Sequence, residues 1–271
     1  MKKTIQFLLL LILFFVIAAC STNDTKEQEN NQSLVETPEE VELTISAAAS
    51  LQDAIVDLQK EFKEEYPNIK LVFNFGGSGS LQQQISHGAP ADLFFSAAMD
   101  KFDTLIDEGL IDKEDRVQLL GNEIVLIVPK DNKNGVTSFE DLSNASKISI
   151  GTPESVPAGQ YGKEALEKMN IWTKIEDKIV YAKDVRQVLT YVETNNVDAG
   201  IVYKTDAVSS NKVKIIATAD ADTHSPIIYP VGVIKDSKHR EEALKFYEYL
   251  QTETSIKTFE EYGFKGLNEA K

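Results

Sequence analysis

The feature that most constrains the fold is a regular alternation of short apolar segments and amphipathic segments after residue 40. Residues 41–48 alternate apolar and polar side chains, which is typical of a strand. Residues 50–67 carry apolar side chains at helical spacing and end at a proline. The same succession recurs along the chain. Strands separated by crossover helices predict an α/β fold with a largely parallel sheet that helices cover on both faces.

The remaining elements follow from the same periodicity. We expect strands at residues 69–75, 91–97, 122–130, 147–153, 178–184, 199–204, 213–219 and 227–235, and helices at residues 80–88, 98–110, 139–144, 158–172 and 185–198. Residues 238–264 are expected to be helical throughout. Phe73, Phe75 and Trp172 are expected in the core. The chain after residue 40 is long enough for one large domain or two ordinary domains.

The N-terminus has the pattern of an export signal. Two lysines precede an apolar run at residues 7–19, which ends in small residues before Cys20. This run is shorter than the ~20 residues of a membrane-spanning helix, so a permanent transmembrane anchor is less favoured. Cys20 is the only cysteine, and "IAAC" resembles the lipobox of bacterial lipoproteins, which implies a lipid on Cys20. The alternative is a secreted protein with an incidental cysteine.

A polar segment separates this signal from the folded part of the chain. We assign residues 1–19 to a signal peptide and residues 20–40 to the lipid-bearing cysteine and a tether. The tether is acidic and poor in large apolar groups, so burial cannot offset its ordering entropy and we expect disorder. The formal net charge of −15 argues against nucleic acid as a partner, because binding phosphate needs a basic face.

Four times the chain passes from a strand into a helix through small or capping residues, at Ser50, Ser78, Ala158 and Val185. Ligands of open α/β sheets bind at the carboxyl ends of strands, where such turns lie. Helix N-termini there offer free N–H groups and the positive end of the dipole, which favours an anion. The glycines around Ser78 allow a close backbone approach to a ligand. Without any ligand, such a turn can also need glycine and serine for its own geometry.

Enzymatic interpretations of this turn are weaker. A Walker-type phosphate loop needs lysine after its last glycine, whereas Ser80 follows Gly79, and a nucleophile elbow needs glycine where Ser80 stands. The histidines His87, His224 and His239 have no spacing typical of a metal site. A hydrolytic or phosphoryl-transfer enzyme would need a nucleophile paired with a base, and no such pair is found. We therefore expect no enzyme activity, no cofactor and no direct metal ligands.

Several motifs together resemble the molybdate-binding proteins of bacterial ABC transporters. The motifs are "AAASL", "GAPADLF", "VPAGQY", "KDVR" and "GIVY", and the resemblance spans residues 41–264. It implies the two-lobed fold of class II periplasmic binding proteins, in which each lobe is a mixed, mainly parallel sheet flanked by helices. Lobe 1 would comprise residues 41–122 and 225–271, and lobe 2 residues 123–224. The implied ligand is molybdate or tungstate, and sulfate or another tetrahedral oxyanion is the alternative.

The resemblance also implies five ligand positions. These are Ser50 and Ser78 through hydroxyl and backbone N–H, Ala158 and Val185 through backbone N–H, and Tyr203 through its hydroxyl. Four of them are the turns found from the pattern, whereas Tyr203 alone would be an ordinary strand-end residue. Neutral donors suit a dianion that carries no proton, because a protonated phosphate would need an acceptor.

Further expectations concern location and partners. We expect a monomer that a lipid on Cys20 anchors at the extracytoplasmic face of the membrane. The family implies that it delivers its anion to a permease with a partner ATPase. Asp184 and Arg186, which flank Val185, are interpreted as a solvated ion pair at the rim of the site rather than as ligand contacts.

Overall fold

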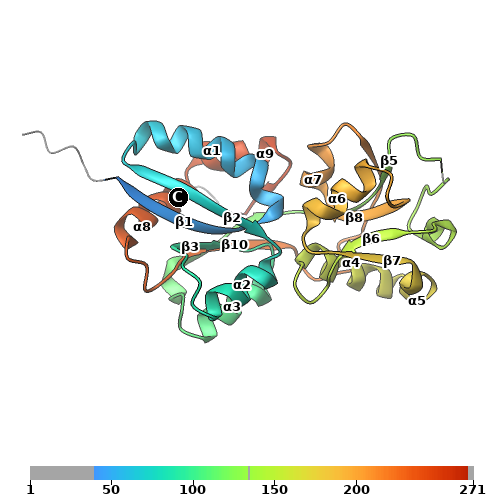
Figure 1. Ribbon diagram of the computed structural model, residues 1–271, viewed down its shortest axis with the longest axis horizontal. Helices are drawn as coiled ribbons and strands as arrows, with labels where there is room; N and C mark the ends of the chain where they lie inside the picture. The colour runs from blue at the N-terminus through green and yellow to red at the C-terminus, as the bar shows by residue number, and fades with distance from the viewer. Residues whose placement is uncertain (1–39, 134, 268–271) are drawn as a thin grey trace, which may run out of the picture. The chain divides into compact units, whose positions relative to one another are not determined.

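The computed structural model describes residues 40–133 and 135–267, which belong to one compact unit, Pro38–Lys271 (Figure 1). The expected signal peptide, Cys20 and nearly all of the expected tether lie outside the described residues. Among the helices of the described part, none is both long enough and apolar enough to cross a membrane.

The first sheet has the strand order β11-β4-β10-β3-β1-β2. Its strands are β1 (Val41–Ala48), β2 (Ile69–Gly76), β3 (Leu93–Phe95), β4 (Arg116–Gly121), β10 (Ile228–Val233) and β11 (Lys265–Gly266). It is flanked by α1 (Gln52–Glu65), α2 (Ser78–Ser86), α3 (Met99–Asp107), α8 (Arg240–Tyr249) and α9 (Glu253–Glu261). In Figure 1, α1 and α9 lie on one side of this sheet and α2 and α3 on the other. We call this sheet with its helices the first lobe.

The second sheet has the order β7-β6-β8-β5-β9 and forms the second lobe with its helices. Its strands are β5 (Ile124–Pro129), β6 (Ile148–Gly151), β7 (Ile179–Ala182), β8 (Ala199–Tyr203) and β9 (Val213–Thr218). Helices α4 (Pro157–Lys168) and α6 (Val185–Glu193) both pack against β6 and β8, and α5 (Trp172–Ile175) and α7 (Lys204–Val208) complete the lobe. Short 3-10 helices are η1 (Ala49–Leu51), η2 (Lys113–Asp115), η3 (Glu140–Asn144) and η4 (Glu176–Lys178).

The predicted architecture of two mixed sheets flanked by helices is confirmed. Strand β1 is parallel to β2 and β3, and β6 is parallel to β7 and β8. Strands β10 and β5 run antiparallel to both of their neighbours, so antiparallel pairing is more extensive than the sequence pattern indicates. Both strands enter their sheet directly from a crossing between the lobes, so no crossover helix imposes a parallel direction. We call residues 122–123 the first crossing and residues 219–227 the second crossing.

Two expected helices are divided. Residues 238–264 form α8 and α9, separated at Leu250–Thr252, because the Thr252 side chain caps α9 by accepting the Ser255 N–H at 3.2 Å. The helix expected at residues 158–172 ends at Lys168, since Asn170 adopts a left-handed conformation with φ 59°.

Of the three aromatic residues expected in the core, one is buried. Trp172 is buried, as expected. Phe73 and Phe75 are only half-buried and stack on each other, because β2 is the edge strand of its sheet.

Candidate functional site

A small pocket with a free volume of about 10 Å³ lies between the two lobes. All the residues that line it are uncharged: Ala48, Ala49, Ser50, Gly76, Gly77, Ser78, Ala97, Val156, Pro157, Ala158, Val185 and Tyr203. The structure therefore brings together all five site residues predicted from the sequence. The first lobe contributes the two serines, and the second lobe contributes the alanine, the valine and the tyrosine.

Three helices begin at this cavity. Ser78 is the first residue of α2, Val185 is the first residue of α6, and Ala158 follows Pro157 at the start of α4. The first N–H groups of a helix have no acceptor within that helix, and proline fits the first position because it has no N–H. The cavity thus faces the first N–H groups of α2 and α6, the N–H of Ala158 in α4 and three positive dipole ends, which favours an anion.

Ser50 and Ser78 each have a buried hydrogen-bond partner in the first lobe. The Ser78 Oγ accepts the backbone N–H of Ala97 at 2.9 Å. A backbone N–H can only donate, so the Ser78 hydroxyl keeps its own proton for another acceptor. The Ser50 Oγ lies 2.9 Å from the hydroxyl oxygen of Tyr229, a fully buried residue on β10.

Tyr203, the last residue of β8, supplies the remaining predicted hydroxyl. Its oxygen lies 3.4 Å from the carbonyl oxygen of Ala97, a long contact that leaves the hydroxyl free to turn toward a better acceptor. Burial raises the pKa of Tyr203 and of Tyr229 well above the usual value for tyrosine. Both hydroxyls therefore stay protonated at physiological pH and can donate.

The lobes are closed over the cavity. Among the five predicted residues, Ser50 is the most exposed, at 6%. The backbone N–H of Gly79 in the first lobe donates to the carbonyl oxygen of Ser155 in the second lobe at 2.9 Å. A Cβ on Gly77 would lie 2.7 Å from the same oxygen, and a Cβ on Gly79 would lie 2.7 Å from the Cα of Ser155.

This contact explains the glycine-rich turn. Gly77 has φ −68°, a value that any residue adopts, so its conformation does not require glycine. What requires glycine at positions 77 and 79 is the close approach of the other lobe. The turn therefore serves closure as well as the cavity wall.

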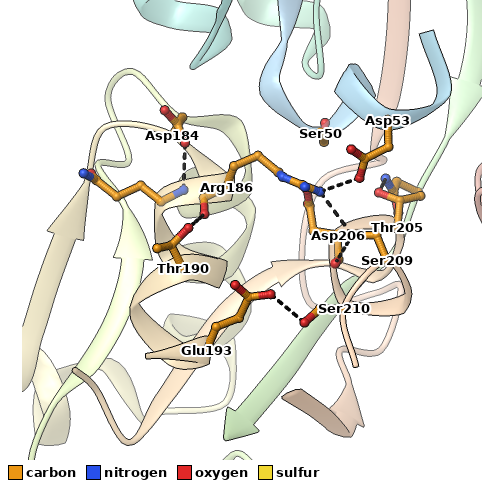
Figure 2. Close-up of polar contacts among 12 residues, drawn as sticks. Ser50, Asp53, Asp184, Arg186, Thr190, Glu193, Thr205, Asp206, Ser209 and Ser210 are labelled. Atoms are coloured by element: carbon orange, nitrogen blue, oxygen red, sulfur yellow. Dashed lines mark hydrogen bonds and ion pairs between the residues drawn. The ribbon is translucent and has the colours of Figure 1, made fainter. Parts of the chain in front are cut away.

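The predicted ion pair between Asp184 and Arg186 is wrong (Figure 2). Asp184 is the N-cap of α6 and accepts the Gln187 N–H at 2.8 Å. Arg186 instead crosses to the first lobe, where its Nη1 donates to Asp53 Oδ2 at 2.9 Å. Asp184 and Arg186 are close in the sequence, but the Asp184 carboxylate is bound to the first turn of α6 as its cap and does not pair with Arg186.

Arg186 also approaches a buried carboxylate within its own lobe. Its Nη1 lies 3.7 Å from Asp206 Oδ1, and Figure 2 shows the two side chains pointing toward one another. Burial raises the pKa of Asp206 to about 7, although the positive charge of Arg186 and the backbone of Tyr203 act to lower the pKa. Asp206 is thus close to half-ionised at neutral pH.

Charged residues also join the lobes at the first crossing. The Glu123 carboxylate pairs with Lys204 of the second lobe at 2.8 Å and with Lys265 of the first lobe at 3.2 Å. These contacts, the one to Lys204 foremost, lower the pKa of Glu123. Glu123 therefore remains ionised and holds the crossing to both lobes.

Sequence reasoning missed part of the cavity wall. Ala97 lies where β3 passes into α3, and its segment "FFSAAMD" has the same strand-to-helix pattern as the turns that were recognised, so the pattern could have identified it. Tyr229 could not have been found in this way, because it is 179 positions from Ser50 in the sequence.

The histidines lie away from the cavity wall. His87 is exposed at the end of α2, as its sequence position indicates, and His224 lies against the Tyr161 ring in the second crossing. Within residues 40–133 and 135–267, no three His, Cys, Asp or Glu side chains gather in a way that could hold a metal ion.

The fold and this cavity define a two-lobed solute-binding protein. The chain belongs to the family of bacterial extracellular solute-binding proteins, whose profile matches residues 43–265. It is 60% identical, over 87% of this chain and 90% of the relative, to a Bacillus subtilis protein provisionally named ABC transporter substrate-binding lipoprotein YvgL. It is 40% identical to the molybdate-binding protein ModA of Escherichia coli, over 83% of this chain and 90% of ModA.

A solved structure agrees with these relatives. It is the substrate-binding domain of a provisionally named molybdenum ABC transporter from Clostridium difficile. The two chains are 45% identical with a TM-score of 0.65, over 84% of this chain and all of the other. Membership of the extracellular family places the protein outside the cytoplasm.

Proposed function

We propose that the protein binds molybdate, and tungstate alike, in the cavity between its lobes. The observation that carries the proposal is that Ser50, Ser78, Ala158, Val185 and Tyr203 line one closed, uncharged cavity. Similarity to ModA and to the molybdenum transporter domain supports the choice of ligand.

Neutral donors account for how an acidic protein would hold a dianion. The chain has a formal net charge of −15, so the anion is bound against the overall field. In the proposed complex, the serine and tyrosine hydroxyls and the N–H groups at the starts of α2, α4 and α6 surround the oxyanion. Hydrogen bonds to a charged acceptor are stronger than neutral ones, and in a closed cavity solvent does not compete for them.

Sulfate is the competing ligand. It has the same charge as molybdate and is smaller, so the same neutral donors suit it electrostatically. Rejection of sulfate would come from the separation at which the closed lobes hold their donors. Gly77 and Gly79, which bring the first lobe against Ser155, take part in setting that separation.

The binding protein acts as the solute-binding component of an ABC importer in this proposal. Closure around the anion presents both lobes in one arrangement to a membrane permease, and a partner ATPase drives import. The chain itself carries out no reaction and holds no resident cofactor. It works as a monomer, anchored by a lipid on Cys20 to the extracytoplasmic face of the membrane.

A thermal-shift series tests the ligand assignment. Melting is measured with molybdate, tungstate, sulfate, phosphate and no added anion. A ligand at one hundred times its dissociation constant adds about 2.7 kcal/mol to stability, a shift of roughly 5 to 10 °C for a body of this size. Shifts with molybdate and tungstate alone support the proposal. A shift with sulfate alone would assign sulfate, and no shift with any of the anions would contradict the site.

A further inference from the structure

A chain of buried hydrogen bonds leads from the first crossing to Ser50. The backbone N–H of Glu123 donates to Asn122 Oδ1 at 2.9 Å, and Asn122 Nδ2 lies 3.1 Å from the Tyr229 hydroxyl oxygen. That hydroxyl lies 2.9 Å from the Ser50 Oγ. Asn122, Tyr229 and Ser50 are all buried.

The direction of this chain follows from its fixed end. A backbone N–H can only donate, so the oxygen of the Asn122 amide faces Glu123 and the NH₂ group faces Tyr229. The NH₂ group can only donate, so the Tyr229 oxygen accepts from it. The same NH₂ group also donates to the Thr205 hydroxyl at 3.0 Å, which holds the amide in this orientation.

Within this series of hydrogen bonds, the Tyr229 hydroxyl proton has one acceptor, the Ser50 Oγ. Burial keeps this proton on Tyr229 by raising its pKa. When Ser50 accepts from Tyr229, its own proton is left for the cavity. Ser78 reaches the same condition by a shorter route, through the N–H of Ala97.

We propose that Asn122 and Tyr229 are positioning residues that orient Ser50 as a hydrogen-bond donor to the bound anion. The inference rests on the proposed function and deepens it, because it assigns selectivity to residues outside the cavity wall. A serine hydroxyl is normally able to accept as well as donate. Ser50 and Ser78 are each supplied with a donor from behind, so neither needs to accept from the ligand.

The consequence is discrimination by protonation state. Fully deprotonated dianions such as molybdate and sulfate present acceptors only, and both serines satisfy them. Hydrogen phosphate carries a proton that needs an acceptor, and a buried proton without one is costly. A Ser50 oxygen that already accepts from Tyr229 keeps a second lone pair, but it is a stronger donor and a poorer acceptor for that proton. Loss of the Tyr229 hydroxyl should therefore weaken binding of the dianion. It should also reduce the difference in affinity between the dianion and hydrogen phosphate.

A double-mutant cycle tests this assignment. Dissociation constants are measured by titration calorimetry for wild type, Ser50→Ala, Tyr229→Phe and the double variant. The ligand is whichever of molybdate and sulfate binds wild type more tightly. Tyr229→Phe alone should weaken binding about threefold to tenfold, and Ser50→Ala about tenfold or more. If Tyr229 acts through Ser50, as proposed, and not through the neighbouring Tyr203 ring, the double variant should match Ser50→Ala within about twofold.

The control is Tyr249→Phe, which removes a first-lobe hydroxyl that contacts Glu61. It should bind like wild type. Multiplying effects in the double variant, or wild-type affinity in Tyr229→Phe, would overturn the proposal. These outcomes differ from failure of the proposed function, in which wild type itself does not bind molybdate. The gap between the dianion and hydrogen phosphate should shrink in Tyr229→Phe, and an unchanged gap would also contradict the proposal.

Asn122→Asp provides a second variant of nearly the same shape, in case Tyr229→Phe does not fold. The carboxylate introduced at position 122 would accept from the Glu123 N–H and from the Tyr229 hydroxyl. The Tyr229 proton would then point away from Ser50, and the Ser50 hydroxyl would have to donate to the Tyr229 oxygen. The added charge weakens anion binding in any background, whereas the reversal acts only when Ser50 is present. The loss caused by Asn122→Asp should therefore be larger in the wild-type background than in Ser50→Ala. Equal losses of affinity in the two backgrounds would contradict the proposed role of Asn122 and Tyr229.

Discussion

Arg186 in the second lobe donates to Asp53 in the first lobe at 2.9 Å, so a salt bridge spans the two lobes beside the cavity. Arg186 directly follows Val185, whose N–H we assign to the anion. Asp53 lies in the first turn of α1, shortly after Ser50. Ligand contacts and a contact that holds the closed arrangement are thus adjacent in the sequence on both sides of the interface.

Asp53→Asn should weaken anion binding modestly by favouring the open arrangement. Both side chains of the salt bridge are about one-third exposed, so it contributes about 0.2 to 1 kcal/mol, or up to fivefold in affinity. The effect should shrink at high salt because solvent ions screen the pair. Calorimetry at low and high ionic strength measures it, and Glu42→Gln, in an ion pair within the first sheet, is the control. Equal effects of the two substitutions would contradict a closing role.

Gly77→Ala should impair closure without destabilising the separate lobes. The added Cβ would lie 2.7 Å from the Ser155 carbonyl oxygen, a contact that exists only between closed lobes. Relieving such a clash costs about 1 to 3 kcal/mol, so affinity should fall about 5- to 150-fold while the melting temperature without ligand is maintained. Gly121→Ala, whose Cβ would meet its neighbours at an ordinary 3.5 Å, is the control. Wild-type affinity in Gly77→Ala would refute this role.

Ser50→Ala and Tyr203→Phe should each weaken molybdate binding by about 1 to 3 kcal/mol, because each removes one neutral donor from a buried dianion. The matched control is Ser149→Ala, since the Ser149 hydroxyl donates to the Val180 carbonyl oxygen within the second sheet. That variant should alter stability and leave affinity unchanged. Wild-type dissociation constants in both site variants would refute the assignment.

Asp206→Asn should flatten part of the pH dependence of stability. Because the pKa of Asp206 is raised to about 7 in the folded protein from an ordinary 3.8, the folded state retains the proton more strongly. The stability of wild type should therefore fall as pH rises from about 4 to 7 and then level off.

The measurement is the free energy of unfolding of wild type and Asp206→Asn between pH 5 and 8. The asparagine variant should gain roughly 2 kcal/mol relative to wild type across this range. Asp141→Asn is the control, because hydrogen bonds from Thr137 lower the pKa of Asp141 and it stays ionised throughout the range. A difference between wild type and Asp206→Asn that does not vary with pH would show that Asp206 does not titrate there.

The sequence predicted the features that local pattern controls. Ser50, Ser78, Ala158 and Val185 lie at strand-to-helix turns because small residues and helical periodicity mark such turns within a few positions. The same reasoning failed at Thr252 and Asn170, where a single capping or left-handed residue divides an otherwise periodic segment. Short breaks of this kind hardly change the periodicity.

Contacts between distant segments could not be predicted. Asp53 and Arg186 are 133 positions apart, and no local pattern indicates that the fold brings them together. The sequence pattern predicts Tyr229 as a strand residue. Its contact with Ser50 is seen only once the fold places β10 beside the cavity. The requirement for glycine at positions 77 and 79 could not be predicted either, because it comes from the close approach of the second lobe.

The central claim is that an uncharged cavity between two lobes selects molybdate, and titration calorimetry with molybdate, sulfate and hydrogen phosphate tests it most directly. We predict one molybdate per chain, much weaker binding of sulfate and the weakest binding of hydrogen phosphate. Equal affinity for molybdate and sulfate would mean that donor spacing does not select between them. Absence of heat with molybdate would contradict the account.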